Sequence, residues 1–117
     1  MSLVDDDESV RESLPDLLRT FGFASRAFSS AADFLASESV DQTDCLILDV
    51  AMQGMSGPAL QEELSRRGRT IPIVFITART VASLRPRLLE AGAIECLLKP
   101  FSEAALLDAV TRALRAR

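Results

Sequence analysis

The sequence contains no histidine, and this absence removes the commonest catalytic base of proteins. Without histidine the chain has no side chain whose ordinary pKa lies near neutrality, and no Ser-His or Cys-His pair. The glycine-rich nucleotide motifs GxGxxG and GxxxxGK(S/T) are also missing. Any chemistry must therefore use carboxylates, hydroxyls and Lys99, the one lysine in a chain whose other basic residues are all arginine.

Further absences exclude whole classes of protein. No apolar run approaches the roughly 18 residues that cross a membrane, and no signal peptide precedes the first apolar segment. The net charge of −4 argues against a domain that binds nucleic acid directly. Cys45 and Cys96 match neither a zinc spacing nor a redox spacing. We expect one soluble, cytoplasmic domain with reduced, structural cysteines and no membrane partner.

Short apolar runs alternate with longer segments of helical period, a pattern typical of βα units around a parallel sheet. Gly22, Gly68 and Gly92 mark helix ends, and Ser30 and Ser102 mark helix starts. Pro15 falls inside the first helix and should cost it about 3 kcal/mol unless the helix kinks there. Strands are expected at 3–4, 24–28, 45–48, 71–76 and 94–98, and helices at 9–21, 31–36, 58–68, 81–91 and from Ser102 onwards.

The polarity of the strands predicts their order in the sheet. Strands 3–4, 45–48 and 71–76 are apolar throughout, as strands covered on both faces must be. The strands that carry Arg26 and Glu95 tolerate polar residues and therefore belong at the edges. The predicted fold is α/β, with a doubly wound five-stranded parallel sheet of order 2-1-3-4-5. The ligand crevice of such a sheet opens at the carboxyl ends of strands 1 and 3.

Polar residues stand at four of the predicted carboxyl ends. Strand 1 runs into the acidic stretch 5–8, strand 3 into Asp49, strand 4 into Thr77 and strand 5 into Lys99. Each feature alone has an ordinary explanation, because acids after a strand usually cap the next helix or face water. Together they predict a cluster of carboxylates. Two carboxylates about 4 Å apart repel by about 4 kcal/mol at an effective dielectric of 20, so a protonated carboxyl, a divalent cation or Lys99 must compensate.

An oxygen-only cluster suits Mg²⁺, and an ionised aspartate can act as a nucleophile towards phosphorus without a base. The stretches LVDDDESVR, LILDVAMQGMSG, FITA and LLKPF resemble the receiver domain of bacterial two-component response regulators, particularly the FixJ type. The resemblance covers essentially the whole chain, and the motifs occur in the family's order. It implies the flavodoxin-like receiver fold over residues 1–117.

The resemblance also implies roles for individual residues. Asp49 would accept a phosphoryl group from a histidine kinase, and Asp6 and Asp49 would bind Mg²⁺ directly with the backbone carbonyl of Ala51. Asp5 would contribute through water. Thr77 would bond to a phosphoryl oxygen, and Lys99 would pair with the phosphate. The family commonly has a cis bond at the position of Lys99-Pro100, which would aim the ammonium into the crevice.

Two departures from the family bear on these roles. The family usually has proline where this chain has Gln53, so the loop after Asp49 is expected to be less rigid. It usually has an aromatic switch residue at the position of Cys96, and a cysteine has no ring to swing. The relay of a Thr77 movement to the surface is therefore in question, and a degenerate receiver that binds partners without phosphorylation stays open as an alternative.

The regulatory output is an expectation of the same kind. Phosphorylation should repack the surface formed by the fourth helix, fifth strand and fifth helix, and so control a homodimer or an output domain. Arg79, Arg85 and Arg87 belong to that surface, or are ordinary solvated charge. A DNA-binding domain beyond residue 117 and a single-domain regulator both remain open. A Mg²⁺-dependent aspartyl-phosphate phosphohydrolase is disfavoured, because Ala51 stands where such enzymes commonly carry a second acid. We expect a regulatory phosphoacceptor rather than an enzyme.

Overall fold

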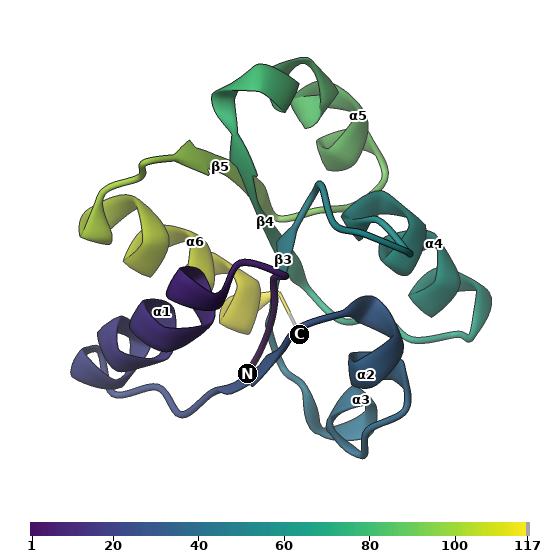
Figure 1. The fold of residues 1–117 in the computed structure, drawn as a ribbon, viewed down its shortest axis with the longest axis horizontal. Coiled ribbons are helices and arrows are strands. Elements are labelled where there is room, and N and C mark those ends of the chain that lie inside the picture. Colours follow the sequence, from purple (N-terminus) through teal and green to yellow (C-terminus); the bar gives the residue numbers. More distant parts are fainter. Residues whose placement is uncertain (117) are drawn as a thin grey trace.

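The computed structural model describes residues 1–116 and shows a five-stranded parallel sheet with helices on both faces (Figure 1). The strand order is β2-β1-β3-β4-β5, as the strand polarity predicted. The strands are β1 Ser2–Val4, β2 Arg26–Phe28, β3 Leu46–Asp49, β4 Ile73–Ala78 and β5 Glu95–Lys99. The α-helices are α1 Glu8–Thr20, α2 Ala31–Leu35, α3 Ser39–Gln42, α4 Gly57–Arg66, α5 Arg85–Glu90 and α6 Glu103–Arg115, and a 3₁₀ segment, η1, covers Arg79–Leu84.

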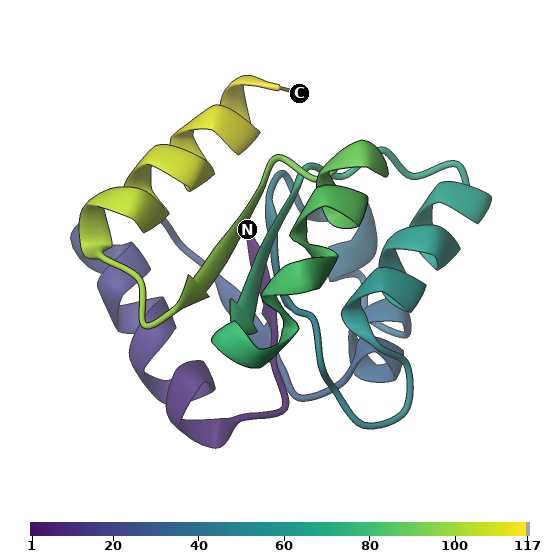
Figure 2. The same ribbon diagram turned by 90° about the horizontal axis from the view of Figure 1, so that it is seen from above.

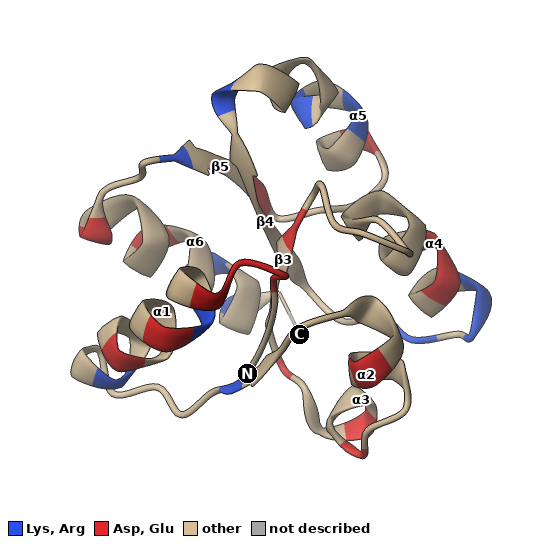
Figure 3. Ribbon diagram, in the orientation of Figure 1, with Lys and Arg blue, Asp and Glu red and all other residues tan. Residues whose placement is uncertain are grey.

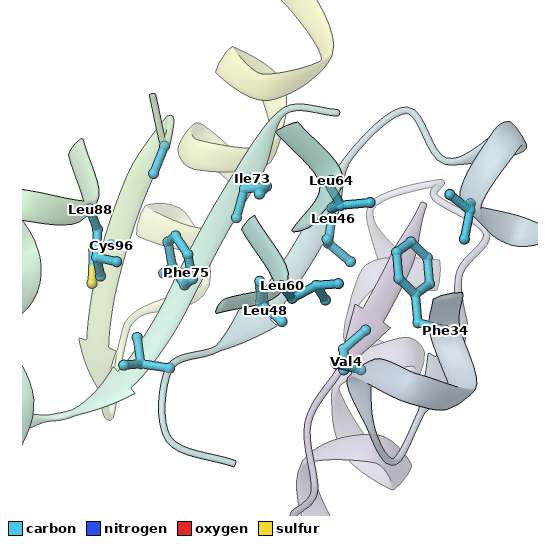
Figure 4. Close-up of a cluster of buried hydrophobic side chains, with 14 residues drawn as sticks. Val4, Phe34, Leu46, Leu48, Leu60, Leu64, Ile73, Phe75, Leu88 and Cys96 are labelled. Carbon is cyan, nitrogen blue, oxygen red and sulfur yellow. The ribbon is translucent and has the colours of Figure 1, made fainter. Parts of the chain in front are cut away.

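The sheet separates two apolar cores. Figure 2 shows helices on both sides of the sheet. The helices α1 and α6 cover one face, where Leu18 and Val110 pack against the strands. The remaining helices cover the other face, where Phe34, Leu60 and Leu88 pack in a second cluster (Figure 4). Because β1, β3 and β4 are buried on both faces, their apolar runs are continuous rather than alternating.

Local sequence signals set most helix ends. The hydroxyls of Ser30, Ser56 and Ser102 accept hydrogen bonds from backbone N–H groups in the first turns of α2, α4 and α6. Gly22, which follows α1, has a φ of 91°, a conformation that glycine adopts at little cost. These observations confirm the predicted helix starts at Ser30 and Ser102 and the predicted end at Gly22.

Two details of the predicted helices were wrong. An additional single-turn helix, α3, follows α2, and four residues are too few to show a helical period. The predicted helix 81–91 divides into η1 and α5, and Val81, within η1, has non-helical backbone angles. Pro15 lies inside the first helix, as the sequence placed it, and α1 runs through it from Glu8 to Thr20.

The remaining expectations concern cysteines and membranes. Cys45 and Cys96 are both free and buried, as structural cysteines should be. Within residues 1–116 there is no helix with the length and apolar character needed to span a bilayer.

Candidate functional site

Residues at the carboxyl ends of four strands meet at one end of the sheet. Asp5 directly follows β1, Asp49 is the last residue of β3, Thr77 is the penultimate residue of β4, and Lys99 ends β5. In Figure 3 the acidic stretch that follows β1 lies beside the acidic end of β3. The parallel register aligns these ends, because Val4 pairs with Leu48 and Asp49 pairs with Ile76. The predicted convergence of the carboxyl ends is therefore confirmed.

Three carboxylates form the centre of the site. One oxygen from each of Asp5, Asp6 and Asp49 lies within 4.8 Å of the others. Asp5 is completely buried and Asp49 is 7% exposed, whereas Asp6 is open to solvent. An all-oxygen donor set with one open side fits a hard cation such as Mg²⁺, which keeps several waters when a protein binds it.

Lys99 supplies the nearest positive charge. Its Nζ donates a hydrogen bond to Oδ2 of Asp5 at 3.3 Å and lies 3.9 Å from Oδ1 of Asp49. The bond between Lys99 and Pro100 is cis, as the family resemblance implied. One ammonium facing three carboxylates leaves the site with an excess of negative charge, and this excess favours a cation or a proton.

Burial and the neighbouring carboxylates both raise the pKa of Asp49. Burial, followed by the charge of Asp5, raises the pKa of the Asp49 carboxyl from 3.8 to about 7, and the ammonium of Lys99 opposes the rise. The charge of Asp6 adds a smaller rise. In the metal-free protein a substantial fraction of Asp49 is therefore protonated at neutral pH. A cation bound among the carboxylates would return Asp49 to its ionised, nucleophilic form.

Thr77 brings a buried hydroxyl to the same end of the sheet. Its side chain is 1% exposed, and among the described residues its Oγ1 has no hydrogen-bond partner. Buried hydroxyls normally have a partner, so this one is available to an incoming oxygen atom. Ala51, by contrast, is exposed on the loop between β3 and α4, and its methyl group can transfer no proton.

The acidic loop is held in place from several sides. The backbone N–H of Asp7 donates to Oδ1 of Asp5 at 2.9 Å, and Arg11 Nη1 donates to the carbonyl oxygen of Asp5 at 3.0 Å. The backbone N–H of Gln53 donates to Oδ2 of Asp6 at 3.2 Å. Sequence reasoning missed Arg11 and the Gln53 N–H, since neither hydrogen bond leaves a signal in residue type or spacing.

The loop after Asp49 depends on a close approach at its far end. Gly57 begins α4, and its N–H donates to the carbonyl oxygen of Val50 at 2.9 Å. A Cβ at Gly57 would collide with the carbonyl oxygen of Asp49 and press on Val50 and Phe75. Gly57 therefore allows the start of α4 to pack directly against the end of β3, which carries Asp49.

Cys96 stands where the family usually has an aromatic switch residue, and its side chain is buried in the core. Cys96 is buried beside Phe75 and Leu88 (Figure 4). The adjacent Glu95 accepts hydrogen bonds from Arg85 at 2.6 Å and from Arg112 at 3.0 Å. Ion pairs therefore tie α5 and α6 to the edge strand β5. The three arginines of the predicted surface, Arg79, Arg85 and Arg87, are all exposed, and Arg85 is also paired with Glu95.

The chain belongs to the response regulator receiver domain family, whose model matches residues 1–111. Receiver domains are the regulatory domains of two-component systems. The similar proteins include Nodulation protein W of Bradyrhizobium diazoefficiens, 44% identical over 111 residues, which are 95% of this chain and 49% of that protein. Transcriptional regulatory protein TdiR of Thauera aromatica is 43% identical over 112 residues, or 96% of this chain and 49% of that protein.

Solved structures agree with this assignment. The structure of response regulator StyR superposes with a TM-score of 0.90 at 50% identity, covering 98% of this chain and 58% of that one. The FixJ-N structure superposes with a TM-score of 0.89 at 32% identity, covering 99% of this chain and 93% of that one. The chain spans about half the length of the curated relatives given above. The predicted FixJ-type receiver fold is confirmed.

Proposed function

We propose that this domain accepts a phosphoryl group on Asp49 from a histidine kinase, and that the modification switches a regulatory surface. The observation that carries the proposal is the convergence of Asp5, Asp6, Asp49 and Lys99 at the end of the sheet where β4 carries Thr77, whose hydroxyl has no partner within residues 1–116. The three carboxylates outnumber the one ammonium of Lys99, which favours a further cation. Together these residues offer an acceptor atom, a positive charge and a hydrogen-bond donor at the carboxyl-terminal end of the sheet.

Each residue has a distinct part in the proposal. Asp6 and Asp49 would hold Mg²⁺ directly together with the backbone carbonyl of Ala51, and Asp5 would contribute through water. The bound ion would neutralise oxygens of the transferring phosphoryl group. Lys99 already faces Asp5 and Asp49, so its ammonium is placed to share the charge of the incoming group. Thr77 donates its unpartnered hydroxyl to a phosphoryl oxygen.

The transfer itself needs little covalent chemistry from the domain. An ionised oxygen of Asp49 attacks phosphorus, and an O–P bond forms as the N–P bond of the kinase phosphohistidine breaks. The electron pair of the broken bond stays on the imidazole nitrogen. Asp49 must be ionised for this step, and Lys99 and the bound cation favour that form over the protonated one.

The proposal also includes what phosphorylation of the domain controls. We infer that the phosphorylated domain controls an output domain beyond residue 117 or a homodimer through α5, β5 and α6. These three elements correspond to the fourth helix, fifth strand and fifth helix predicted from the sequence. Support comes from the relatives, whose names include transcriptional regulatory proteins about twice as long as the matched segment.

Binding of beryllofluoride, which imitates a phosphoryl group on a carboxylate, tests the proposal. In ¹⁹F NMR the wild-type domain should show bound beryllofluoride only when Mg²⁺ is present, and Asp49→Asn should show none. Absence of a bound signal in the wild type would favour the degenerate receiver. Steady hydrolysis of p-nitrophenyl phosphate at ordinary enzyme rates would instead favour the phosphohydrolase.

A further inference from the structure

The loop after Asp49 contacts the exposed member of the acidic cluster through a backbone group. The N–H of Gln53 donates to Oδ2 of Asp6 at 3.2 Å and joins two loops that are 47 residues apart in the sequence. A proline at this position has no N–H to donate. The hydrogen bond is therefore available to this chain because residue 53 is not proline.

Asp6 has fewer constraints than its neighbours in the cluster. Asp5 is completely buried and accepts hydrogen bonds from the backbone of Asp7 and from Lys99. Asp49 is buried at the end of β3. Asp6 lies in the loop before α1 and is exposed. Its carboxylate would sample several rotamers in water without a donor to fix one oxygen.

We propose that the backbone N–H of Gln53 is the positioning group for the Asp6 carboxylate in metal binding, an inference that rests on the proposed function. With Oδ2 held by the N–H, the other oxygen of Asp6 is left for the cation. Hydrogen bonds of this kind orient metal-ligating carboxylates, and their loss typically weakens metal binding about 10- to 100-fold.

The same bond fixes the flexible part of the β3–α4 loop. Gly54 follows directly with a φ of 76°, so the chain at this point has little intrinsic stiffness. The N–H of Gln53 anchors the loop to Asp6, and the Gly57 N–H anchors its far end to Val50. In this chain the hydrogen bond from Gln53 to Asp6 thus restrains the loop, which the ring of a proline at residue 53 would otherwise restrain.

Three substitutions at residue 53 separate the N–H from the stiffness of the loop. Gln53→Ala keeps the N–H and removes the side chain, Gln53→Gly keeps the N–H and loosens the loop, and Gln53→Pro removes the N–H and stiffens the loop. Mg²⁺ affinity is measured by titration calorimetry, and melting curves confirm that each variant folds. We expect affinities close to wild type for alanine and glycine, and an affinity about tenfold weaker for proline.

Different results lead to different conclusions. Equal or tighter Mg²⁺ binding by Gln53→Pro, or a marked loss in Gln53→Gly, would overturn the inference while leaving the proposed function intact. Absence of Mg²⁺ binding by the wild type would overturn both.

A second measurement needs neither metal nor a proline variant. In the metal-free wild type, the Gln53 amide proton should exchange slowly with solvent, and Asp6→Ala should accelerate that exchange. Exchange that is unchanged by Asp6→Ala would contradict the hydrogen bond on which the inference rests.

Discussion

Lys99 and Asp5 are separated by 94 residues in the sequence, yet the lysine Nζ lies 3.3 Å from a carboxylate oxygen of a completely buried aspartate. The contact joins the ends of β1 and β5, which are separated in the sheet by β3 and β4. Lys99 reaches Asp49 as well, at 3.9 Å. Among the described residues, it is the cation that the structure pairs with these acids.

The first prediction concerns the loss of that cation. Lys99→Met keeps most of the apolar stem but leaves Asp5 buried without its ammonium partner. We expect the free energy of unfolding at neutral pH and without metal to fall by about 1 to 3 kcal/mol, because a buried acceptor loses its donor. Urea denaturation in EDTA measures this change, and added Mg²⁺ should restore part of it. Exposed Arg79→Met is the matched control, and equal stability of the two variants would contradict the pairing.

The second prediction concerns pH. The pKa of Asp49 is raised from 3.8 to about 7, so the folded state holds a proton on this group that the unfolded state has already released. Its stabilising contribution is fully present below about pH 3.8 and is lost as pH rises through about 7. In EDTA, wild-type stability should fall over this window by a component that Asp49→Asn lacks. A difference between wild type and variant that does not change with pH would contradict the raised pKa.

The third prediction is that Asp49→Asn stabilises the metal-free domain near pH 8, where wild-type Asp49 is mostly ionised. Removing one charge from the cluster relieves repulsion on the order of 1 to 4 kcal/mol. Thermal melting in EDTA should show a higher melting temperature for the variant, and Mg²⁺ should raise the wild-type value more than that of the variant. A markedly lower melting temperature in EDTA would mean that the acids do not converge.

The fold could be predicted from the sequence because its signals are local and redundant. The apolar runs of β3 and β4 identify central strands, and Arg26 and Glu95 identify the edges. The acids, Thr77 and Lys99 could be placed together because parallel strands align their carboxyl ends. The single turn of α3 and the break at Val81 could not be predicted, since short segments carry no periodicity.

Other features of the site depend on backbone geometry that residue types do not encode. The hydrogen bonds from Arg11 to the Asp5 carbonyl and from the Gln53 N–H to Asp6 arise only when two loops meet. Because the family usually has proline where this chain has Gln53, the sequence predicted a less rigid loop. In the structure the backbone N–H of Gln53, which a proline would lack, also donates a hydrogen bond to Asp6.

The fourth prediction concerns Thr77. Its buried hydroxyl has no partner among the described residues, and a buried unpaired hydroxyl costs about 1 to 3 kcal/mol. Thr77→Val should therefore leave the metal-free domain as stable as wild type or more stable by about 1 kcal/mol. The same variant should bind beryllofluoride more weakly in the presence of Mg²⁺. Destabilisation by more than about 1 kcal/mol would show that the hydroxyl already has a partner.

The fifth prediction concerns the packing under Asp49. Gly57→Ala places a methyl group against the carbonyl oxygen of Asp49, and overpacking of this kind costs about 1 to 3 kcal/mol or more. Gly22→Ala is the control, because its Cβ would meet open space and its cost of about 1 kcal/mol comes from the positive φ alone. Urea denaturation should show the larger loss at Gly57. A larger loss at Gly22 would contradict the close approach.

Mass measurement after incubation with acetyl phosphate and Mg²⁺ tests the central claim most directly. The wild-type domain should gain a single phosphate that maps to the peptide containing Asp49, and omission of Mg²⁺ or substitution Asp49→Asn should abolish the gain. Wild-type protein that stays unmodified under these conditions, or that carries its phosphate on another residue, would contradict the account.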